Sequence, residues 1–324
     1  MTAPRLNFVH CPDNAGGHRM AYWQWGDASS AHVVLCVHGL SRQGRDFDTL
    51  AAALCARAEQ KAGSLRVVCP DVVGRGQSDW LADPTAYQIP TYTADMLALL
   101  AQLERQAPIS ALDWVGTSMG GLIGLVVCAQ AGLPVPRCRP PHGLSEPAPL
   151  SVRRLVLNDV GPTLQWQAVA RIGSYLGQGG PFKTLQQAAD ALWLISSGFG
   201  PHTPAQWLAL SRPMVKPLEP SDAESGECRL HYDPAIAVPF KQATEASTAQ
   251  GDSVLWQLYD RVTARTLVLR GALSDLLSAP TMRAMTLRGP AAQWVEFPGV
   301  GHAPTLVADD QVQAVQAFLL DSIN

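Results

Sequence analysis

The chain has 324 residues, of which 47% are hydrophobic and 16% are charged, and its formal net charge is −3. This length suits one large α/β domain with an insert, or two ordinary domains, and the composition is typical of a compact globular protein with a thick core. A small negative charge gives no electrostatic attraction to nucleic acid or to an anionic membrane surface, so neither is expected as a partner.

Further features favour a cytoplasmic protein. No apolar run approaches the roughly 18 residues that a membrane-spanning helix needs. The first residues, MTAPRLNFVHCPDNAGG, lack the basic head, apolar stretch and cleavage site of a secretory signal. The seven cysteines are odd in number and include no C-x-x-C pair. We therefore expect free structural thiols, with no disulfide and no zinc or redox site.

The first half of the chain alternates strand and helix patterns. RLNFVH and RMAYWQWG, joined by a turn-rich link, predict an antiparallel hairpin at the start. Continuous apolar runs at 32–39 and 65–71 predict strands buried on both faces. Helices are expected near 46–60 and 91–106. This alternation indicates a mostly parallel sheet with right-handed crossovers.

The pattern changes in the second half. The proline-rich stretch 132–149 predicts an irregular surface loop, and a strand, VRRLVLND, follows it. Helical spacing then dominates until about residue 247, after which strand and helix alternate again. We therefore expect a helical insert that covers the active edge of the sheet. The expected division is a first core part (1–161), an inserted helical cap (162–247) and a second core part (248–324).

The segment LDWVGTSMGGLIG changes from strand-like to helical hydrophobic spacing at Ser118. G-x-S-x-G at such a turn is the pattern of a nucleophile elbow. Gly116 and Gly120 have no Cβ, so strand and helix can approach closely while the serine oxygen stands above the carboxyl edge of the sheet. The helix beginning at Met119 directs free N–H groups toward the same place. The alternative interpretation is a glycine-rich helix start with Ser118 as its N-cap.

A serine nucleophile needs a base, and the base needs an orienting acid. At such an elbow the expected chain order is Ser, then Asp or Glu, then His. TLVLRGALSDLLS supplies Asp275 shortly after a strand, and QWVEFPGVGHAPTL supplies His302 in a glycine-flanked loop after the next strand. Asp159 also follows a strand and is the alternative acid, although a turn or cap role ahead of Gly161 suits it better.

The run LCVHGLSRQ predicts the remaining part of a hydrolytic site. His38-Gly39 ends a strand and allows the chain to present the N–H of Leu40. That N–H and the N–H of Met119 would hold the negative oxygen of a tetrahedral intermediate. We expect His38 to have a structural, hydrogen-bonding role. Arg42 is either a contact for a substrate carboxylate or carbonyl, or an ordinary solvated arginine.

These motifs together resemble the α/β-hydrolase fold family over essentially the whole chain. The residues that carry the resemblance are HGLS (38–41), DVVGRGQSD (71–79), GTSMGG (116–121), LVLNDVGP (155–162), LRGALSD (269–275) and GHAP (301–304). The resemblance implies a mostly parallel eight-stranded sheet flanked by helices, with an inserted helical cap. It also implies Ser118 as nucleophile, His302 as general acid and base, and Asp275 as the acid that orients His302.

The elbow residue separates subclasses of this family. Relatives that dehalogenate or open epoxides carry an aspartate there, so a serine counts against both activities. Relatives that hydrolyse carbon–carbon bonds of ring-fission products share Ser-Met-Gly-Gly, as do cofactor-free perhydrolases. The carbon–carbon hydrolases, however, tend to have a more glycine-rich stretch after His-Gly than LSRQGRD.

The leading interpretation is a serine hydrolase that cleaves a small or medium-sized carboxylic ester through an acyl-enzyme. The alternatives are a carbon–carbon bond hydrolase of a ring-fission dienone and a non-catalytic binding protein of the same fold. Trp166 and Trp193 either line an apolar acyl or aryl pocket or hold the cap to the core. No ligand cluster or phosphate-binding glycine loop is evident, so neither a metal nor an organic cofactor is expected. The sequence does not indicate the oligomeric state.

Overall fold

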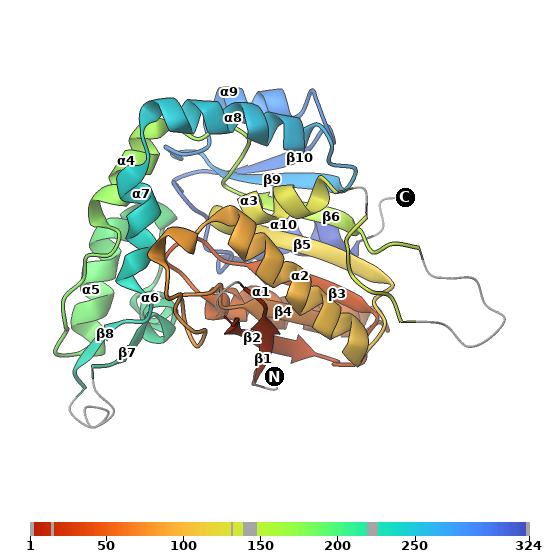
Figure 1. The fold of residues 1–324 in the computed structure, drawn as a ribbon, viewed down its shortest axis with the longest axis horizontal. Coiled ribbons are helices and arrows are strands. Elements are labelled where there is room, and N and C mark those ends of the chain that lie inside the picture. The colour runs from red at the N-terminus through yellow and green to blue at the C-terminus, as the bar shows by residue number, and fades with distance from the viewer. Residues whose placement is uncertain (1–2, 14–15, 131, 139–147, 219–225, 322–324) are drawn as a thin grey trace.

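The computed structural model describes residues 3–13, 16–130, 132–138, 148–218 and 226–321 (Figure 1). Its main feature is an eight-stranded sheet. From one edge to the other, its strands are β1 (Arg5–Cys11), β2 (His18–Gly26), β4 (Arg66–Pro70), β3 (His32–Val37), β5 (Ala111–Thr117), β6 (Val152–Asn158), β9 (Arg265–Gly271) and β10 (Gln293–Phe297).

The sheet is parallel except at one edge. β1 pairs antiparallel with β2, and β2 pairs antiparallel with β4, whereas every other neighbouring pair is parallel. The predicted opening hairpin and the predicted mostly parallel eight-stranded sheet are therefore confirmed. In the register, Gly116 of β5 lies opposite Val37 of β3 and Leu157 of β6, so the carboxyl ends of three central strands meet at one place. Parallel strands of this kind commonly have their active site at that edge.

Helices cover both faces of the sheet (Figure 1). α1 and α10 pack on one face, where the cluster around Leu50, Leu54 and Phe318 is buried. α2, α3 and α9 contribute to the larger cluster on the other face. The helices of these two layers are α1 (Asp48–Gln60), α2 (Ile89–Gln106), α3 (Met119–Cys128), α9 (Ala279–Met285) and α10 (Asp309–Leu320). Short 3₁₀ turns are η1 (Gly44–Phe47), η2 (Pro84–Ala86), η3 (Ser197–Phe199), η4 (Arg212–Met214) and η6 (Pro234–Ala237).

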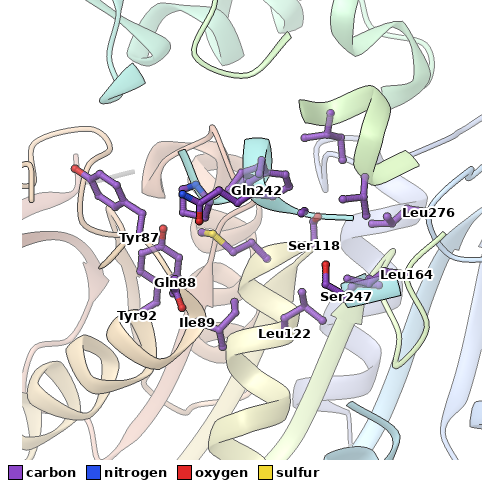
Figure 2. Close-up of a pocket in the computed structure, with 18 of the residues that line it drawn as sticks. Tyr87, Gln88, Ile89, Tyr92, Ser118, Leu122, Leu164, Gln242, Ser247 and Leu276 are labelled. Carbon is purple, nitrogen blue, oxygen red and sulfur yellow. The ribbon is translucent and has the colours of Figure 1, made fainter. Parts of the chain in front are cut away.

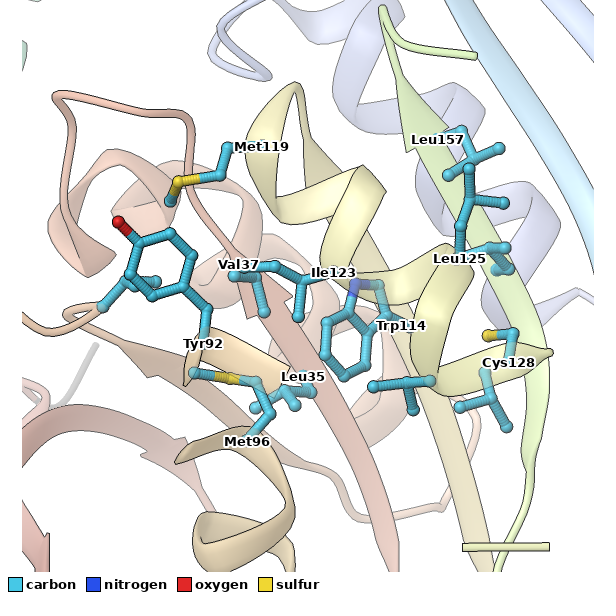
Figure 3. Close-up of a cluster of buried hydrophobic side chains, with 14 of the residues drawn as sticks. Leu35, Val37, Tyr92, Met96, Trp114, Met119, Ile123, Leu125, Cys128 and Leu157 are labelled. Carbon is cyan, nitrogen blue, oxygen red and sulfur yellow. The ribbon is translucent and has the colours of Figure 1, made fainter. Parts of the chain in front are cut away.

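The larger cluster fixes α3 to the sheet. Figure 3 shows Met96 and Tyr92 of α2 facing Leu35 and Val37 of β3, with Trp114 packed against α3. The indole of Trp114 is fully buried and donates a hydrogen bond of 3.0 Å to the carbonyl of Gly120 in the first turn of α3. A buried indole N–H needs such a partner, and this one ties the start of α3 to strand β5.

The segment between β6 and β9 contains five helices and a small hairpin among its described residues: α4 (Trp166–Tyr175), α5 (Leu185–Ser196), α6 (Pro204–Ser211), β7 (Val215–Pro217), β8 (Cys228–Leu230), α7 (Val238–Gln242) and α8 (Glu245–Tyr259). Helices α4 to α7 stand together beyond the ends of the central strands, at the left of Figure 1. We call residues 159–264 the β6–β9 segment.

Two details of the β6–β9 segment differ from the sequence expectation. β7 and β8 form an antiparallel pair where no strand was predicted, because strands of three residues are too short to show a pattern. The expected boundary between residues 247 and 248 falls inside α8, which continues to Tyr259. Part of the predicted surface loop at 132–149 lies outside the described residues.

Two further expectations can be compared with the structure. All seven cysteines are free thiols, as predicted. Among the described residues, no helix has the combination of length and apolar character needed to span a membrane.

Candidate active site

Ser118 lies at the turn from β5 into α3 and has a strained backbone. Its φ is 50° and its ψ is −115°, a conformation that non-glycine residues rarely adopt. The turn is held by a hydrogen bond of 3.0 Å from the Ser118 N–H to the carbonyl of Asn158. Ser118 occupies the N-cap position of α3, but its side chain makes no capping hydrogen bond. The hydroxyl is therefore available for another partner.

The two flanking glycines are required by close packing around Ser118. A Cβ on Gly116 would collide with the main chain of Gly120, and a Cβ on Gly120 would collide with the carbonyl of Val37. The sequence prediction of a tight strand-to-helix turn at Ser118 agrees with this geometry.

His302 lies in the loop between β10 and α10 and reaches Ser118. Its Nε2 is 3.0 Å from the Ser118 Oγ, and its Nδ1 is 2.8 Å from a carboxylate oxygen of Asp159. A carboxylate only accepts hydrogen bonds, so Nδ1 donates to it. In the neutral ring Nε2 is then the acceptor for the serine hydroxyl. Only 10% of the His302 side chain is exposed, so water does not surround this chain of hydrogen bonds.

The carboxylate partner of His302 is Asp159 and not Asp275, contrary to the first expectation from the sequence. Asp159 is fully buried and accepts three hydrogen bonds. They come from His302, from the N–H of Gly271 (2.9 Å) and from the hydroxyl of Ser274 (2.6 Å). Asp159 directly follows β6, the strand next to β5, as Ser118 directly follows β5.

Asp275 lies four positions beyond the end of β9 and faces the β6–β9 segment. Its two carboxylate oxygens pair with Arg171 of α4, at 2.7 Å from Nε and 3.0 Å from Nη2. Both side chains are nearly half exposed. Sequence reasoning missed Ser274, which adjoins Asp275 in LRGALSD, and Arg171, for which the helical spacing of α4 gave no signal.

The loop after β3 brings Leu40 beside Ser118. An ideal Cβ on Gly39 would lie 3.7 Å from the Ser118 Cβ. Leu40 and Met119 both line the larger cavity at Ser118. The buried guanidinium of Arg75 donates to the carbonyl of Leu40 at 2.8 Å, and so fixes the peptide group that follows Leu40. This contact gives Arg75 a structural role beside the site, whereas the oxyanion role of the two N–H groups stays a prediction.

His38 connects two loops at the base of the site. Its Nδ1 donates to the carbonyl of Gly39 at 2.7 Å, and its Nε2 accepts from the N–H of Val72 at 2.9 Å. Burial lowers the pKa of His38 to about 3, so the ring is neutral at ordinary pH. Both ring nitrogens are engaged by main-chain groups, which agrees with the structural role expected for His38.

Two cavities adjoin Ser118. The larger has a volume of about 590 Å³ and is mostly apolar (Figure 2). In that view Ile89 and Leu122 lie below the space, Leu164 and Leu276 lie to one side of Ser118, and Gln242 lies above. The smaller cavity, of about 90 Å³, has apolar residues such as Leu192, Ile195 and Phe199 in its lining, and it is also lined by Ser118, His302, Arg42, Arg171 and Tyr175. Ser118 therefore lies between an apolar space and a smaller one whose lining includes two arginines.

The other candidate substrate contacts occupy different positions. Arg42 lines the smaller cavity, but it is buried and is not the solvated arginine that the sequence allowed. Its Nε and Nη2 pair with the carboxylate oxygens of Asp46 at 2.6 and 2.7 Å. Trp193 packs edge-to-face on Trp207, with ring centroids 5.0 Å apart. Neither Trp166 nor Trp193 is among the described residues that line the two cavities at Ser118.

One cluster away from Ser118 has metal-ligand chemistry. Ligand atoms of Cys11, His18 and Asp95 all lie within 4.8 Å of one another in the buried region between β1, β2 and α2. His18 already bridges two carboxylates, with Nδ1 at 3.1 Å from Asp13 and Nε2 at 3.1 Å from Asp95. The ring is thus engaged in an ionic network, and sequence spacing gave no indication of it.

Known proteins similar to this chain share its fold over nearly its full length. The sequence profile of the group described as "Alpha/beta hydrolase family" matches residues 34–315. The chain is 46% identical over 316 residues to the 3-hydroxybutyrate-oligomer hydrolase of Cupriavidus necator, covering 98% of both chains. An alpha/beta hydrolase structure from Novosphingobium aromaticivorans matches with TM-score 0.77 at 34% identity, over 99% of this chain and 100% of that one. A Rickettsia typhi structure matches with TM-score 0.79 at 26% identity, over 98% of this chain and 100% of that one.

Proposed function

Because the chain belongs to the alpha/beta hydrolase family and is a hydrolase, we propose that it cleaves carboxylic esters through an acyl-enzyme on Ser118. His302 is the general base and acid, and Asp159 orients it. The observation that carries this proposal is the unbroken series of hydrogen bonds from Ser118 through His302 to Asp159. The series lies at the carboxyl edge of the sheet, beside an apolar cavity of about 590 Å³.

The geometry supports a two-step reaction. Nε2 of His302 accepts the Ser118 proton while Oγ attacks the ester carbon, and the buried carboxylate of Asp159 stabilises the imidazolium that forms. The N–H groups of Leu40 and Met119 stabilise the negative oxygen of the tetrahedral intermediate. His302 then gives the proton to the leaving alcohol oxygen. Water, deprotonated by the same ring, releases the acid and restores Ser118.

For the substrate, we propose short oligoesters of 3-hydroxyalkanoic acids. The support is the relative whose name states that it hydrolyses 3-hydroxybutyrate oligomers, and with which the chain shares 46% identity over 98% of its length. The mostly apolar cavity suits short aliphatic acyl chains. The same relative favours an ester substrate over the ring-fission dienone, which the sequence left open as an alternative. Action in the cytoplasm stays a prediction.

The decisive experiment compares wild type with Ser118→Ala on two kinds of ester. Purified protein is assayed with p-nitrophenyl butyrate and with the linear trimer of 3-hydroxybutyrate, and a ring-fission dienone is included as a third substrate. We expect wild type to turn over both esters, and Ser118→Ala to lower kcat by several powers of ten because the nucleophile is lost. A fluorophosphonate probe is expected to label wild type only. Unchanged ester turnover by Ser118→Ala would refute the proposal, and a strong preference for the dienone would reassign the substrate.

A further inference from the structure

We propose that Arg171 forms a carboxylate-binding subsite on the His302 side of the nucleophile. Through this subsite the enzyme selects esters whose leaving alcohol carries a free carboxylate, and so releases the carboxyl-terminal unit of an oligoester. This inference rests on the proposed function and adds to it the direction in which the substrate lies.

The direction follows from the path of the proton. When the acyl–oxygen bond breaks, the leaving oxygen takes a proton from Nε2 of His302, so the leaving group must lie next to that ring. Ser118 and His302 both line the cavity of about 90 Å³, whereas His302 is not among the described residues that line the cavity of about 590 Å³, and Ser118 is not among those that line the adjoining cavity of about 460 Å³. The leaving alcohol therefore occupies the small cavity, and the acyl chain occupies the large one.

The small cavity contains two arginines that differ in availability. Arg42 has a side chain only 10% exposed, pairs with Asp46 through two nitrogens and also donates to the carbonyl of Leu210. Arg171 has a side chain 42% exposed, and its partner Asp275 is 46% exposed. A water-exposed ion pair is weak because solvent screens it. Arg171 is therefore the cation that an incoming carboxylate can reach.

Arg171 is also positioned to accept a second anion. It lines the small cavity together with Ser118 and His302, and it lines an adjoining cavity of about 460 Å³ together with His302 and Asp275. Two hydrogen bonds to Asp275 do not exhaust the five N–H donors of a guanidinium. Tyr175, one turn further along α4, also lines the small cavity.

The chemistry of the leaving unit fits this arrangement. Cleavage of the last ester bond of a 3-hydroxybutyrate oligomer transfers the acyl chain to the Ser118 Oγ. The proton passes to the departing oxygen and frees 3-hydroxybutyrate. Its carboxylate lies only two carbons beyond the carbon that bears this oxygen. A cavity of about 90 Å³ is far below the roughly 300–1,000 Å³ of pockets for drug-sized ligands. It therefore suits one short unit.

The test compares the linear 3-hydroxybutyrate trimer as free acid with its methyl ester, which removes the negative charge and adds a methyl group, and it follows cleavage of the ester bonds between the hydroxybutyrate units. Arg171→Gln is expected to raise KM for the free acid by about 10- to 100-fold, as loss of a charged hydrogen-bonding partner does, while kcat changes little. KM for the methyl ester and for p-nitrophenyl butyrate should change much less, because neither substrate carries the carboxylate. Arg171→Lys keeps the charge but loses the planar fork of the guanidinium. Its KM for the free acid is therefore expected to lie between those of wild type and Arg171→Gln.

Arg288→Gln is the matched control. Arg288 forms a similar exposed pair with Asp260, and neither residue lines the cavities at Ser118. This variant should keep the wild-type KM for the free acid. A trimer labelled with ¹³C in its carboxyl-terminal unit should release labelled monomer first.

Two results would contradict the proposed carboxylate-binding subsite. They are equal effects of Arg171→Gln on free acid and methyl ester, or release of unlabelled monomer first by wild type. Failure of the proposed function would differ from both, because wild type would then leave p-nitrophenyl butyrate intact as well.

Discussion

The carboxylate of Asp159 is held at both of its oxygens. One accepts from the N–H of Gly271, and the other accepts from Ser274 and His302. Because the group is also fully buried, it has a single orientation and fixes the imidazole with its Nε2 toward Ser118. Asp275, half exposed and paired with Arg171, offers no such constraint on His302.

This difference predicts unequal effects of two matched substitutions. Asp159→Asn is expected to lower kcat for p-nitrophenyl butyrate by about 10,000-fold, because an amide favours the wrong imidazole tautomer. Asp275→Asn is expected to lower it less than about tenfold, because the same change leaves the hydrogen bond to His302 intact. Steady-state kinetics of both purified variants decide the matter. A larger loss in Asp275→Asn would return the orienting role to that residue.

At this scale the sequence predicted the pairing of Ser118 with His302, which the structure shows, but it ranked Asp275 above Asp159, the carboxylate that contacts His302. Ser118 and His302 stand in distinctive glycine-flanked turns. Asp159 and Asp275 both follow apolar strands, and the sequence does not say which strand adjoins β5. A usable signal was the distance from the strand end, because Asp159 follows β6 directly while Asp275 is separated from β9 by three residues.

The junction of β5 with α3 is the element on which the position of Ser118 depends. Gly120 passes so close to Val37 that no Cβ fits, and Trp114 bonds the carbonyl of the same glycine. By contrast, a Cβ on Gly251, in the middle of α8, would meet no other heavy atom within 4 Å beyond the helix backbone and its chain neighbours. The chain thus offers a glycine required by contact and a glycine with open space around it.

Alanine at these two positions should have opposite effects on stability. Gly120→Ala is expected to destabilise the protein by more than about 2 kcal/mol and to lower activity, because β3 and α3 must separate. Gly251→Ala is expected to stabilise it by about 0.5–1 kcal/mol, since alanine loses less backbone entropy in a helix. Urea denaturation of both variants tests the pair. Equal stability of Gly120→Ala and wild type would contradict the close approach.

Elements with long hydrophobic patterns were predictable, and short ones were not. The core strands and the helices α1 and α2 agree with the sequence within a few residues. In the β6–β9 segment, the small β7–β8 hairpin and the continuation of α8 past residue 247 were missed. Packing against the core and not local periodicity determines these elements, so a single sequence carries little sign of them.

At the scale of the whole molecule, His18 joins the opening hairpin to α2. Its ring contacts Asp95 of α2 on one side and Asp13, beyond the end of β1, on the other. Burial alone would lower the pKa of His18, but hydrogen bonds and attraction to Asp95 and Asp13 raise it above its ordinary value. Protonated His18 therefore stabilises the folded chain.

The sign of this shift predicts a pH-dependent loss of stability. A raised folded-state pKa gives stabilisation that is complete below the unfolded pKa of about 6.5 and is lost as pH rises through the folded value. His18→Gln should therefore lower Tm more at pH 5.5 than at pH 9. Thermal unfolding of both proteins across this range measures the difference, and His10→Gln on the exposed side of β1 is the control. A deficit that grows with pH would show that His18 is held neutral.

The residues of the site come from two different parts of the chain, and this affects how such enzymes diversify. Ser118 and Asp159 directly follow strands and His302 lies in the loop after β10, whereas α4 supplies Arg171 and other lining residues of both cavities. Under the proposed mechanism, mutations in α4 change which ester is accepted while the residues that break the ester bond keep their positions. Substrate selectivity can therefore evolve through changes in α4 while the residues that follow the sheet strands, and the reaction they carry out, stay the same.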